Sequence, residues 1–399
     1  MNVTAVEPNT RLRKIFLFFV CTYFASICLF PSKAEAVGLI TLILAIIQTS
    51  KAERLDFFKD SALYALLTFG VYSSAVNAFG LGEVARTGII YGWTVPFLVG
   101  KAFARFNSAN LLKHVFFASL ALAVFMLVAQ ILYLLGVNQI GDINFKMNSL
   151  TLTFRNSSRT AIFVATGAFL CLTYAIYNRS KRTSFLALFS CTTLISALVG
   201  TGSRMTLTAF LLCSSFFLFL QNKIRILLLV FAIILLLVPF FGKEQRFNLN
   251  PSHLIFTQSA IERFTVWYAA WEIFKEHPMM GSGFRTFKEK AAPHVAHYRT
   301  VNTQINEYET LSDAHNIVLH LLSESGLLGT SIFAAIFFYS ARNSLYLRVN
   351  AAIPLILCIV LIFLHAQLHV NIFSTNVSGL LFLLTGMSSG LQVKGEHNL

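Results

Sequence analysis

Long apolar segments separated by short polar turns make up most of the chain, and one long polar stretch, 242–313, interrupts them. A helix needs roughly 20 apolar residues to cross a bilayer, and most of the segments approach this length. We therefore predict about twelve transmembrane helices. The segments lie near residues 15–30, 36–50, 60–77, 84–100, 111–136, 160–177, 184–200, 205–220, 226–241, 327–341, 351–368 and 373–390.

Two of these segments, 36–50 and 327–341, are short for a bilayer. We expect both to extend into their flanking residues, and the second to continue from a helix over 312–325. No small-residue cleavage site follows the segment at 15–30, which predicts a retained span and not a signal peptide.

The composition is that of a membrane protein. Hydrophobic residues make up 56% of the chain and charged residues 12%, with a mean hydropathy of +0.68, whereas soluble domains carry about 25% charged residues. The apolar segments are continuous and do not alternate as the strands of a barrel do. The predicted fold is an all-α polytopic membrane protein.

Basic residues gather in alternate turns, and this asymmetry predicts the orientation. If the N-terminus is cytoplasmic, every cytoplasmic turn carries Lys or Arg, whereas the outer turns near 31–35, 78–83 and 366–372 contain only Lys33. Both termini are then cytoplasmic, and the net charge of +14 reflects topology and not nucleic-acid binding. The cytoplasmic clusters are Arg11/Arg13/Lys14, Lys51/Arg54/Lys59, Lys101/Arg105/Lys113, Arg179/Lys181/Arg182, Lys223/Arg225, Arg342/Arg348 and Lys394.

This topology divides the chain into residues 1–241 with nine helices, a large periplasmic helical loop at 242–313, and residues 314–399 with three helices. The loop is too long for the positive-inside rule to explain its charge. Its basic residues suit an anionic substrate, because guanidinium groups match phosphate oxygens; contact with lipid headgroups or solvent is the alternative. They are Lys243, Arg246, Arg263, Lys275, Arg285, Lys288, Lys290 and Arg299.

Within the loop, residues 254–276 carry apolar and aromatic side chains at helical spacing, which predicts an amphipathic helix on the membrane surface, its aromatic face down. The helix is expected to end before the His-Pro pair at 277–278, and Gly281 allows a tight turn. Arg263 and Trp267 lie one turn apart near the start of this helix, so a rigid element would carry the guanidinium. The alternative is that Arg263 only reaches the lipid headgroups.

A second helix is predicted from Ser312 or Asp313, either of which is a good N-cap, to Gly326. His315 would then lie in the first turn, where unpaired N–H groups and the helix dipole favour a phosphate and a neutral imidazole. A neutral His315 could accept a proton as a general base. A capping or surface role is the alternative.

The third candidate is the Gly-Thr-Gly-Ser-Arg sequence at 200–204, which the topology places at the outer end of a span. A charge such as Arg204 at this depth is costly and usually functional, and an interfacial anchor is the alternative. His365 and His369 would share a helix face, but no carboxylate accompanies them, so two polar groups at a helix mouth are favoured over a metal site. The chain contains no CxxC, GxGxxG, Walker or HExxH sequence.

Together these segments resemble the superfamily of O-antigen ligases and O-antigen polymerases of bacterial envelopes. The resemblance covers residues 200–330 directly, and Ser203-Arg204 begins it at a span start. Arg285 departs from the pattern, since a small residue or proline is expected there; it would be an additional phosphate contact or face solvent. The longer motifs are R-x-x-x-W-x-x-A…H-P-x-x-G-x-G-x-x-x-F (Arg263, Trp267, Ala270, His277, Pro278, Gly281, Gly283, Phe287) and H-N-x-x-L…E-x-G-x-x-G (His315, Asn316, Leu319, Glu324, Gly326, Gly329).

The resemblance implies an inverting, metal-independent glycosyltransferase of the GT-C-like kind, without cofactors, in the bacterial inner membrane with its active site facing the periplasm. The donor would be a glycan on undecaprenyl diphosphate, and the acceptor a sugar hydroxyl of lipid A-core; membrane lipids surround the protein. Arg204 and Arg263 would bind the diphosphate and stabilise the leaving charge, while His315 removes the acceptor proton. Asn316 would orient His315 or the acceptor. The other substrate-binding candidates are Arg285, Trp267 and Ser203.

Within the superfamily we favour the ligase, which transfers the whole polysaccharide. The alternatives are the polymerase, which extends the glycan on its carrier, and a protein O-oligosaccharyltransferase. A lipid-linked glycan flippase or other transporter is the alternative from a different class. A transporter would carry arginines along its inner spans, whereas the non-cytoplasmic basic residues here crowd the outer face, which favours an enzyme.

Overall fold

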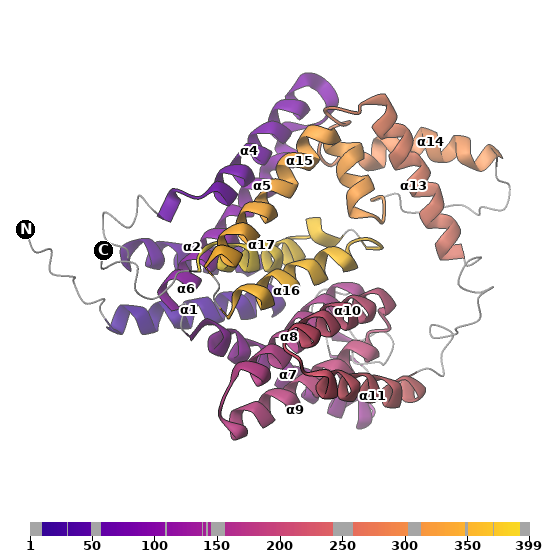
Figure 1. Cartoon of the computed structure of the whole chain (residues 1–399). Helices are drawn as coiled ribbons and strands as arrows, with labels where there is room; N and C mark the ends of the chain where they lie inside the picture. The colour runs from indigo at the N-terminus through magenta and orange to yellow at the C-terminus, as the bar shows by residue number, and fades with distance from the viewer. Residues whose placement is uncertain are drawn as a thin grey trace, which may run out of the picture.

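The protein is built almost entirely of helices (Figure 1). The structure, a computed structural model, describes residues 10–29, 31–48, 57–107, 110–137, 139–140, 143–144, 156–241, 258–301, 313–347, 350–369 and 371–391. Strand structure in these residues is limited to the two-residue β1 (Gln139–Ile140) and β2 (Ile143–Asn144), which pair antiparallel. The predicted all-α fold is confirmed.

Each predicted apolar segment corresponds to a helix, although the segment at 84–100 is broken at Trp93. The first part contains α1 (Thr10–Leu29), α2 (Pro31–Gln48), α4 (Ser61–Val76), α5 (Gly88–Gly92), α6 (Thr94–Asn107), α7 (Leu111–Leu134), α8 (Ser157–Tyr177), α9 (Lys181–Gly200), α10 (Arg204–Leu220) and α11 (Ile224–Phe241). Next come α13 (Gln258–Glu276), α14 (Phe287–Val301), α15 (Ile317–Tyr346), α16 (Ala352–His365) and α17 (Thr375–Ser389). The short helical turns are η1 (Asn77–Leu81), η2 (Val84–Thr87) and η5 (Asn371–Phe373).

The lengths of these helices are those of a polytopic membrane protein. By length and composition, five can cross a bilayer: Ser61–Gly80, Leu111–Leu134, Ser157–Tyr177, Lys181–Gly200 and Ile317–Tyr346. The shorter apolar helices include most of α2, α10 and α16. The two short segments extend as predicted, because α2 begins at Pro31 and α15 continues through a kink at Gly326.

A buried ion pair ties together α4, α6 and α17. Lys101, which the charge pattern assigns to a cytoplasmic cluster, is 5% exposed, and its Nζ lies 2.7 Å from Asp60 Oδ2 and 2.6 Å from Phe57 O. Ser389 on α17 donates a hydrogen bond to the same carboxylate. A buried pair is tolerated when other hydrogen bonds complete it, as they do here. Lys101 therefore has a structural partner in addition to any topological role.

The helices α13 and α14 form a small unit at the right of Figure 1. The helix α13, which the sequence predicts over 254–276, ends at Glu276, directly before the His-Pro pair, as expected. Its buried face is aliphatic, whereas Phe264 and Trp271 of its aromatic face are 52% and 47% exposed, which suits a membrane interface. The residues in the contact with α14 are Val266, Ala269, Ala270, Ile273, Phe287, Ala291 and Val295.

The turn after α13 packs backbone against backbone on the kink of α15. Gly283 N donates to Glu324 O at 2.9 Å, and Leu327 N donates to Pro278 O at 2.9 Å. Gly281 and Gly326 adopt left-handed backbone, with φ of 75° and 62°. A Cβ on Gly281 would lie 2.3 Å from the carbonyl carbon of Glu324. Glycine is therefore required where the two sequence motifs meet.

Replacement of Gly281 by alanine is expected to destabilise the protein by about 2–4 kcal/mol, because the new methyl group overlaps the α15 backbone and the φ is strained for a side chain. Thermal unfolding in one detergent measures this loss. Gly88→Ala is the matched control, since its φ is −54° and a Cβ there meets no atom within 4 Å. Equal stability of the two variants would contradict the packing described for this turn.

Candidate functional site

Ser203 and Arg204 lie where α9 turns into α10. Gly202 makes the turn with a φ of 67°, Ser203 occupies the N-cap position, and Arg204 is the exposed first residue of α10. The Ser203 hydroxyl does not cap the helix but forms a 2.6 Å hydrogen bond with Thr206 Oγ1. Arg204 is thus presented at the helix start, as predicted, while Ser203 makes an internal contact.

His315 precedes α15 and does not lie in its first turn, so the predicted N-cap was wrong. Asn316 is the N-cap, and its Oδ1 accepts hydrogen bonds from Val318 N and Leu319 N at 3.0 Å. Asp313 instead accepts a 2.9 Å hydrogen bond from His315 N, and Ser312 lies outside the described residues. His315 has a left-handed φ of 48°, a conformation that non-glycine residues adopt rarely and that is frequent at functional sites.

Asp313 also contacts the imidazole ring of His315. His315 Nδ1 lies 3.1 Å from Asp313 Oδ1, and both side chains are partly buried. A carboxylate at this distance favours the tautomer with its proton on Nδ1, which leaves Nε2 as the acceptor. The pair therefore has the arrangement of an oriented general base, in which a third group holds the ring. The sequence had suggested Asp313 only as a helix cap.

The histidine pair at the end of α16, His365 and His369, lies between this turn and α10. The His365 ring stacks on that of His369, with centroids 5.3 Å apart, and His365 Nδ1 lies 2.8 Å from Thr206 Oγ1. Ile317 N donates to Ala366 O at 3.1 Å, which fixes the start of α15 beside the same segment. Thus His365 belongs to a hydrogen-bonded chain that reaches Ser203 through Thr206, and His369 contacts it by ring stacking.

His369 lies within electrostatic range of the other candidates. Burial lowers its pKa to about 4, and the positive charge of Arg263 and the imidazole of His315 lower it further, while Asp313 opposes them. Arg263 is partly buried and lies in the second turn of α13, which begins at Gln258. The sequence had placed Arg263 at the start of this helix. The charges of Arg263, His315 and Asp313 therefore all act on His369.

This pKa predicts a pH dependence of stability. Because folding lowers the pKa of His369 from 6.5 to about 4, the unfolded chain binds the proton more readily, and stability is lost as the pH falls from 6.5 toward 4. The loss from this residue is about 3 kcal/mol. His369→Asn should flatten the curve of unfolding free energy over this pH range; a curve as steep as that of the wild type would contradict this account.

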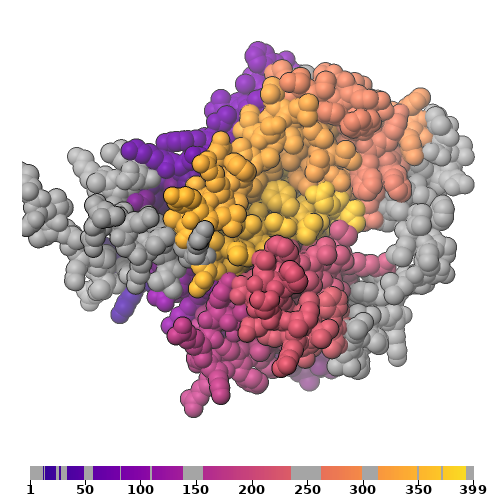
Figure 2. Space-filling model, in the orientation of Figure 1, coloured from indigo at the N-terminus to yellow at the C-terminus, as the bar shows by residue number. Residues whose placement is uncertain are grey.

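Four segments far apart in the sequence therefore meet: the start of α10, α13, the turn before α15 and the turn after α16. In Figure 1 these parts lie on the same side of the bundle, toward α13. Figure 2 shows the yellow surface of the C-terminal region between the orange α15 and the magenta helices that precede α13. The residues brought together are Thr206, Arg263, Asp313, His315, His365 and His369, and Arg204 begins the helix that carries Thr206.

Two of the predicted substrate residues occupy different surroundings. The Trp267 indole Nε1 is buried one turn after Arg263 and has no hydrogen-bond partner among the described residues. Arg285 is exposed and has a φ of 60°; its backbone N–H donates to Glu324, and its carbonyl accepts from Arg86. Within the described chain, no contact joins Arg285 to His315 or Arg263.

Glu324, which the sequence indicated only as a motif position, is the buried carboxylate that holds the loop to α15. Its side chain is 3% exposed and accepts hydrogen bonds from Arg285 N at 2.8 Å and Phe287 N at 2.9 Å. Phe287 begins α14, so Glu324 satisfies an N–H group that a helix start leaves unpaired. His320 Nε2 lies 3.5 Å from the same carboxylate.

Glu324→Gln is expected to cost about 2–3 kcal/mol of stability, because an amide offers one acceptor oxygen and leaves one of the two buried N–H groups unpaired. The difference in unfolding temperature between the variant and the wild type in one detergent measures this loss of stability. Glu276→Gln changes a side chain that is 56% exposed and 3.4 Å from His294, and should shift stability by less than about 0.5 kcal/mol. Equal shifts would show that Glu324 does not anchor the loop.

His, Cys, Asp and Glu side chains do not gather in groups of three that could hold a metal ion within the part of the chain that the structure describes. His365 and His369 are the nearest approach to such a group near the candidate site, and Thr206 already occupies one ring nitrogen. The candidate groups at the site are Arg204, Arg263 and the imidazole that Asp313 contacts.

A comparison with known families identifies a region that contains most of this arrangement. Residues 189–334 match the O-antigen ligase family model. The match covers α9 to the first half of α15, including Arg204, Arg263 and His315, and confirms the resemblance to the O-antigen ligase superfamily. None of the curated proteins compared with the chain matches it. The pair at 365–369 lies beyond the O-antigen ligase match.

Proposed function

We propose that the chain is an O-antigen ligase, an inverting glycosyltransferase that moves a polysaccharide from undecaprenyl diphosphate to a sugar hydroxyl of lipid A-core. The proposal rests chiefly on one observation: Asp313 contacts the His315 ring at 3.1 Å, and the charge of Arg263 acts on His369 together with this pair. A general base next to a fixed guanidinium is what attack on a glycosyl diphosphate requires.

The proposed reaction has three linked parts. His315 Nε2 accepts the proton of the acceptor hydroxyl, and the oxygen forms a bond to the anomeric carbon. The bond between that carbon and the phosphate oxygen breaks on the opposite face, which inverts the configuration. Arg263 and Arg204 bind the diphosphate and stabilise its charge as it leaves, because guanidinium groups donate to two oxygens at once.

An apolar cavity beside the site supports a lipid-linked donor. It has a volume of about 280 Å³ between α15 and α16, and it begins at Ile317, two residues after His315. Phe333, Phe337 and Phe363 line it. An apolar chain could lie there while the attached diphosphate reaches Arg263. Asn316, Trp267, Ser203 and Arg285 remain proposed substrate residues; of these, the Trp267 indole offers an unused donor.

We further propose the three-part organisation given by the charge pattern, with residues 242–313 as a periplasmic loop between two sets of helices in the inner membrane. The termini would be cytoplasmic. In Figure 1 the indigo start of α1 lies at the left and the α13–α14 unit at the right, on opposite sides of the bundle. This placement agrees with a topology in which the loop and the start of α1 lie at opposite faces of the membrane.

The test is a transfer assay with the full-length purified protein in vesicles, glycan on undecaprenyl diphosphate, lipid A-core and EDTA. Labelled glycan should appear on lipid A-core, and undecaprenyl diphosphate should be released, without added metal. Longer glycan on the carrier would identify a polymerase instead. Movement of the donor across the bilayer without transfer would identify a transporter.

A further inference from the structure

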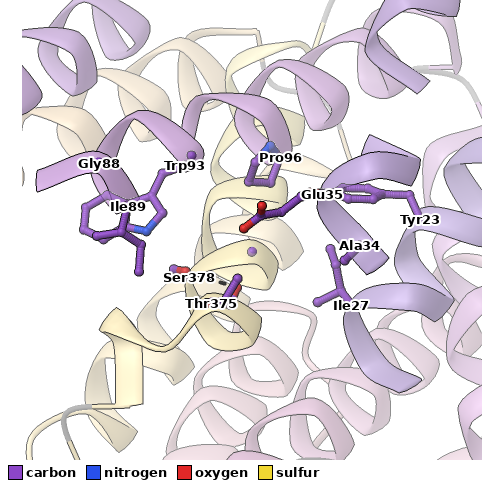
Figure 3. Close-up of a pocket in the computed structure, with 12 residues that line it drawn as sticks. Tyr23, Ile27, Ala34, Glu35, Gly88, Ile89, Trp93, Pro96, Thr375 and Ser378 are labelled. Carbon is purple, nitrogen blue, oxygen red and sulfur yellow. Dashed lines mark hydrogen bonds between the residues drawn. The ribbon is translucent and has the colours of Figure 1, made fainter. Parts of the chain in front are cut away.

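A second cavity lies between the second half of α1, the start of α2, the α5–α6 segment and the start of α17 (Figure 3). None of the residues of the candidate functional site lines it. Its volume is about 300 Å³, which is at the lower end of the range for small-ligand sites. The cavity is therefore large enough for part of a ligand and separate from the proposed glycosyltransferase chemistry.

Two of the polar groups that line this cavity, Glu35 and Trp93, favour opposite partners. Of the twelve described residues that line it, Glu35 alone is charged, and Figure 3 shows its carboxylate extending into the space. Trp93 is 2% exposed, and its indole Nε1 is buried without a hydrogen-bond partner among the described residues. An unpaired buried donor is costly, so the indole N–H calls for an acceptor on a ligand. The carboxylate calls for a cation or a donor.

The surroundings of Glu35 are those of a lipid-facing surface. Leu39, one turn further along the same face of α2, is 53% exposed, and Ile43, a turn beyond, is 49% exposed. Apolar side chains that remain this exposed in a polytopic protein face the bilayer. A ligand therefore reaches the cavity through the membrane and is itself amphiphilic.

We propose that this cavity binds the primary ammonium headgroup of a zwitterionic phospholipid. Glu35 pairs with the ammonium group, and the Trp93 N–H donates to a phosphate or ester oxygen of the same lipid. An anionic lipid, including a diphosphate-linked glycan, is disfavoured because Glu35 is the charged group of the lining and carries the same sign. The site is thus a lipid-binding site distinct from the donor site.

The test is native mass spectrometry of the full-length protein, equilibrated with equal amounts of phosphatidylethanolamine, phosphatidylcholine and phosphatidylglycerol of identical acyl chains. The wild type should retain phosphatidylethanolamine about tenfold better than the other two, which is the effect of one charge-assisted hydrogen bond. Glu35→Gln should abolish this preference, while Glu276→Gln, an exposed carboxylate on α13, should preserve it.

A second variant fills the cavity without disturbing the fold. A Cβ on Gly92 meets no atom within 4 Å, and Gly92 lines the cavity, so Gly92→Leu places its side chain in open space. This variant should elute as the wild type does on gel filtration and lose the preferred lipid. The proposal is overturned if the wild type shows no headgroup preference, or if Glu35→Gln or folded Gly92→Leu retains it. If glucosamine displaced the lipid, the ligand of the cavity would be an amino sugar and not a phospholipid, which would also overturn the proposal.

Discussion

Replacement of His315 by alanine is expected to lower the rate of glycan transfer by about 10²–10⁴-fold, the contribution of a positioned general base. The protein should still fold, because His315 lies in a turn before α15 and the helix is capped by Asn316. The rate is measured with purified protein and a saturating lipid-linked donor. Asp313→Asn should lower the rate as well, since the Asp313 contact orients the His315 ring.

The matched control is His294→Ala. His294 lies on α14, partly buried and 3.4 Å from Glu276, and touches none of the candidate residues within the described chain. Its replacement should leave transfer within a few fold of the wild type. Near-normal turnover of His315→Ala at unchanged protein levels would remove the proposed base.

Arg263→Lys is expected to reduce transfer by about 10²-fold, comparable to the loss of one preorganised donor at a developing charge. A lysine ammonium keeps the positive charge but cannot donate to two phosphate oxygens in a fixed geometry. Because the charge grows as the carbon–oxygen bond breaks, the loss should appear in kcat more than in KM. The measurement is the initial rate over a range of donor concentrations.

Arg182→Lys provides the control for this substitution. Arg182 is an exposed residue in the first turn of α9 and is not among the proposed substrate residues. Its conversion to lysine should therefore have little effect. If Arg263→Lys were equally harmless, Arg263 would be a headgroup anchor, as the alternative interpretation of the sequence holds.

Hydropathy and breaker residues predicted much of the fold. The apolar segments correspond to helices because lipid-facing and core residues are both apolar, so the pattern does not depend on tertiary contacts. The end of α13 at Glu276 follows from the His-Pro pair, and the kink of α15 follows from Gly326, whose left-handed φ suits glycine. The break at Trp93 was not predicted, since the segment around it is uniformly apolar.

The local geometry of the site could not be predicted in the same way. Asp313 and Asn316 are both good N-caps, and local propensity cannot choose between them. The hydrogen bond from Ile317 N to Ala366 O, which joins residues 49 apart in the sequence, accompanies the later start of α15. The pair His365 and His369 has no metal-binding companions in sequence, and its link to Thr206 requires α10 and α16 to pack together.

The central claim is that the site containing His315 transfers O-antigen to lipid A-core. The most direct measurement is a lipopolysaccharide gel of the host strain lacking this gene, complemented with the wild type or with His315→Ala. We expect bare core, with polymer accumulating on the lipid carrier, in the deletion strain and with His315→Ala, and restored ladders with the wild type. Core bearing a single repeat unit would indicate a polymerase, and an unchanged ladder in the deletion strain would contradict the account.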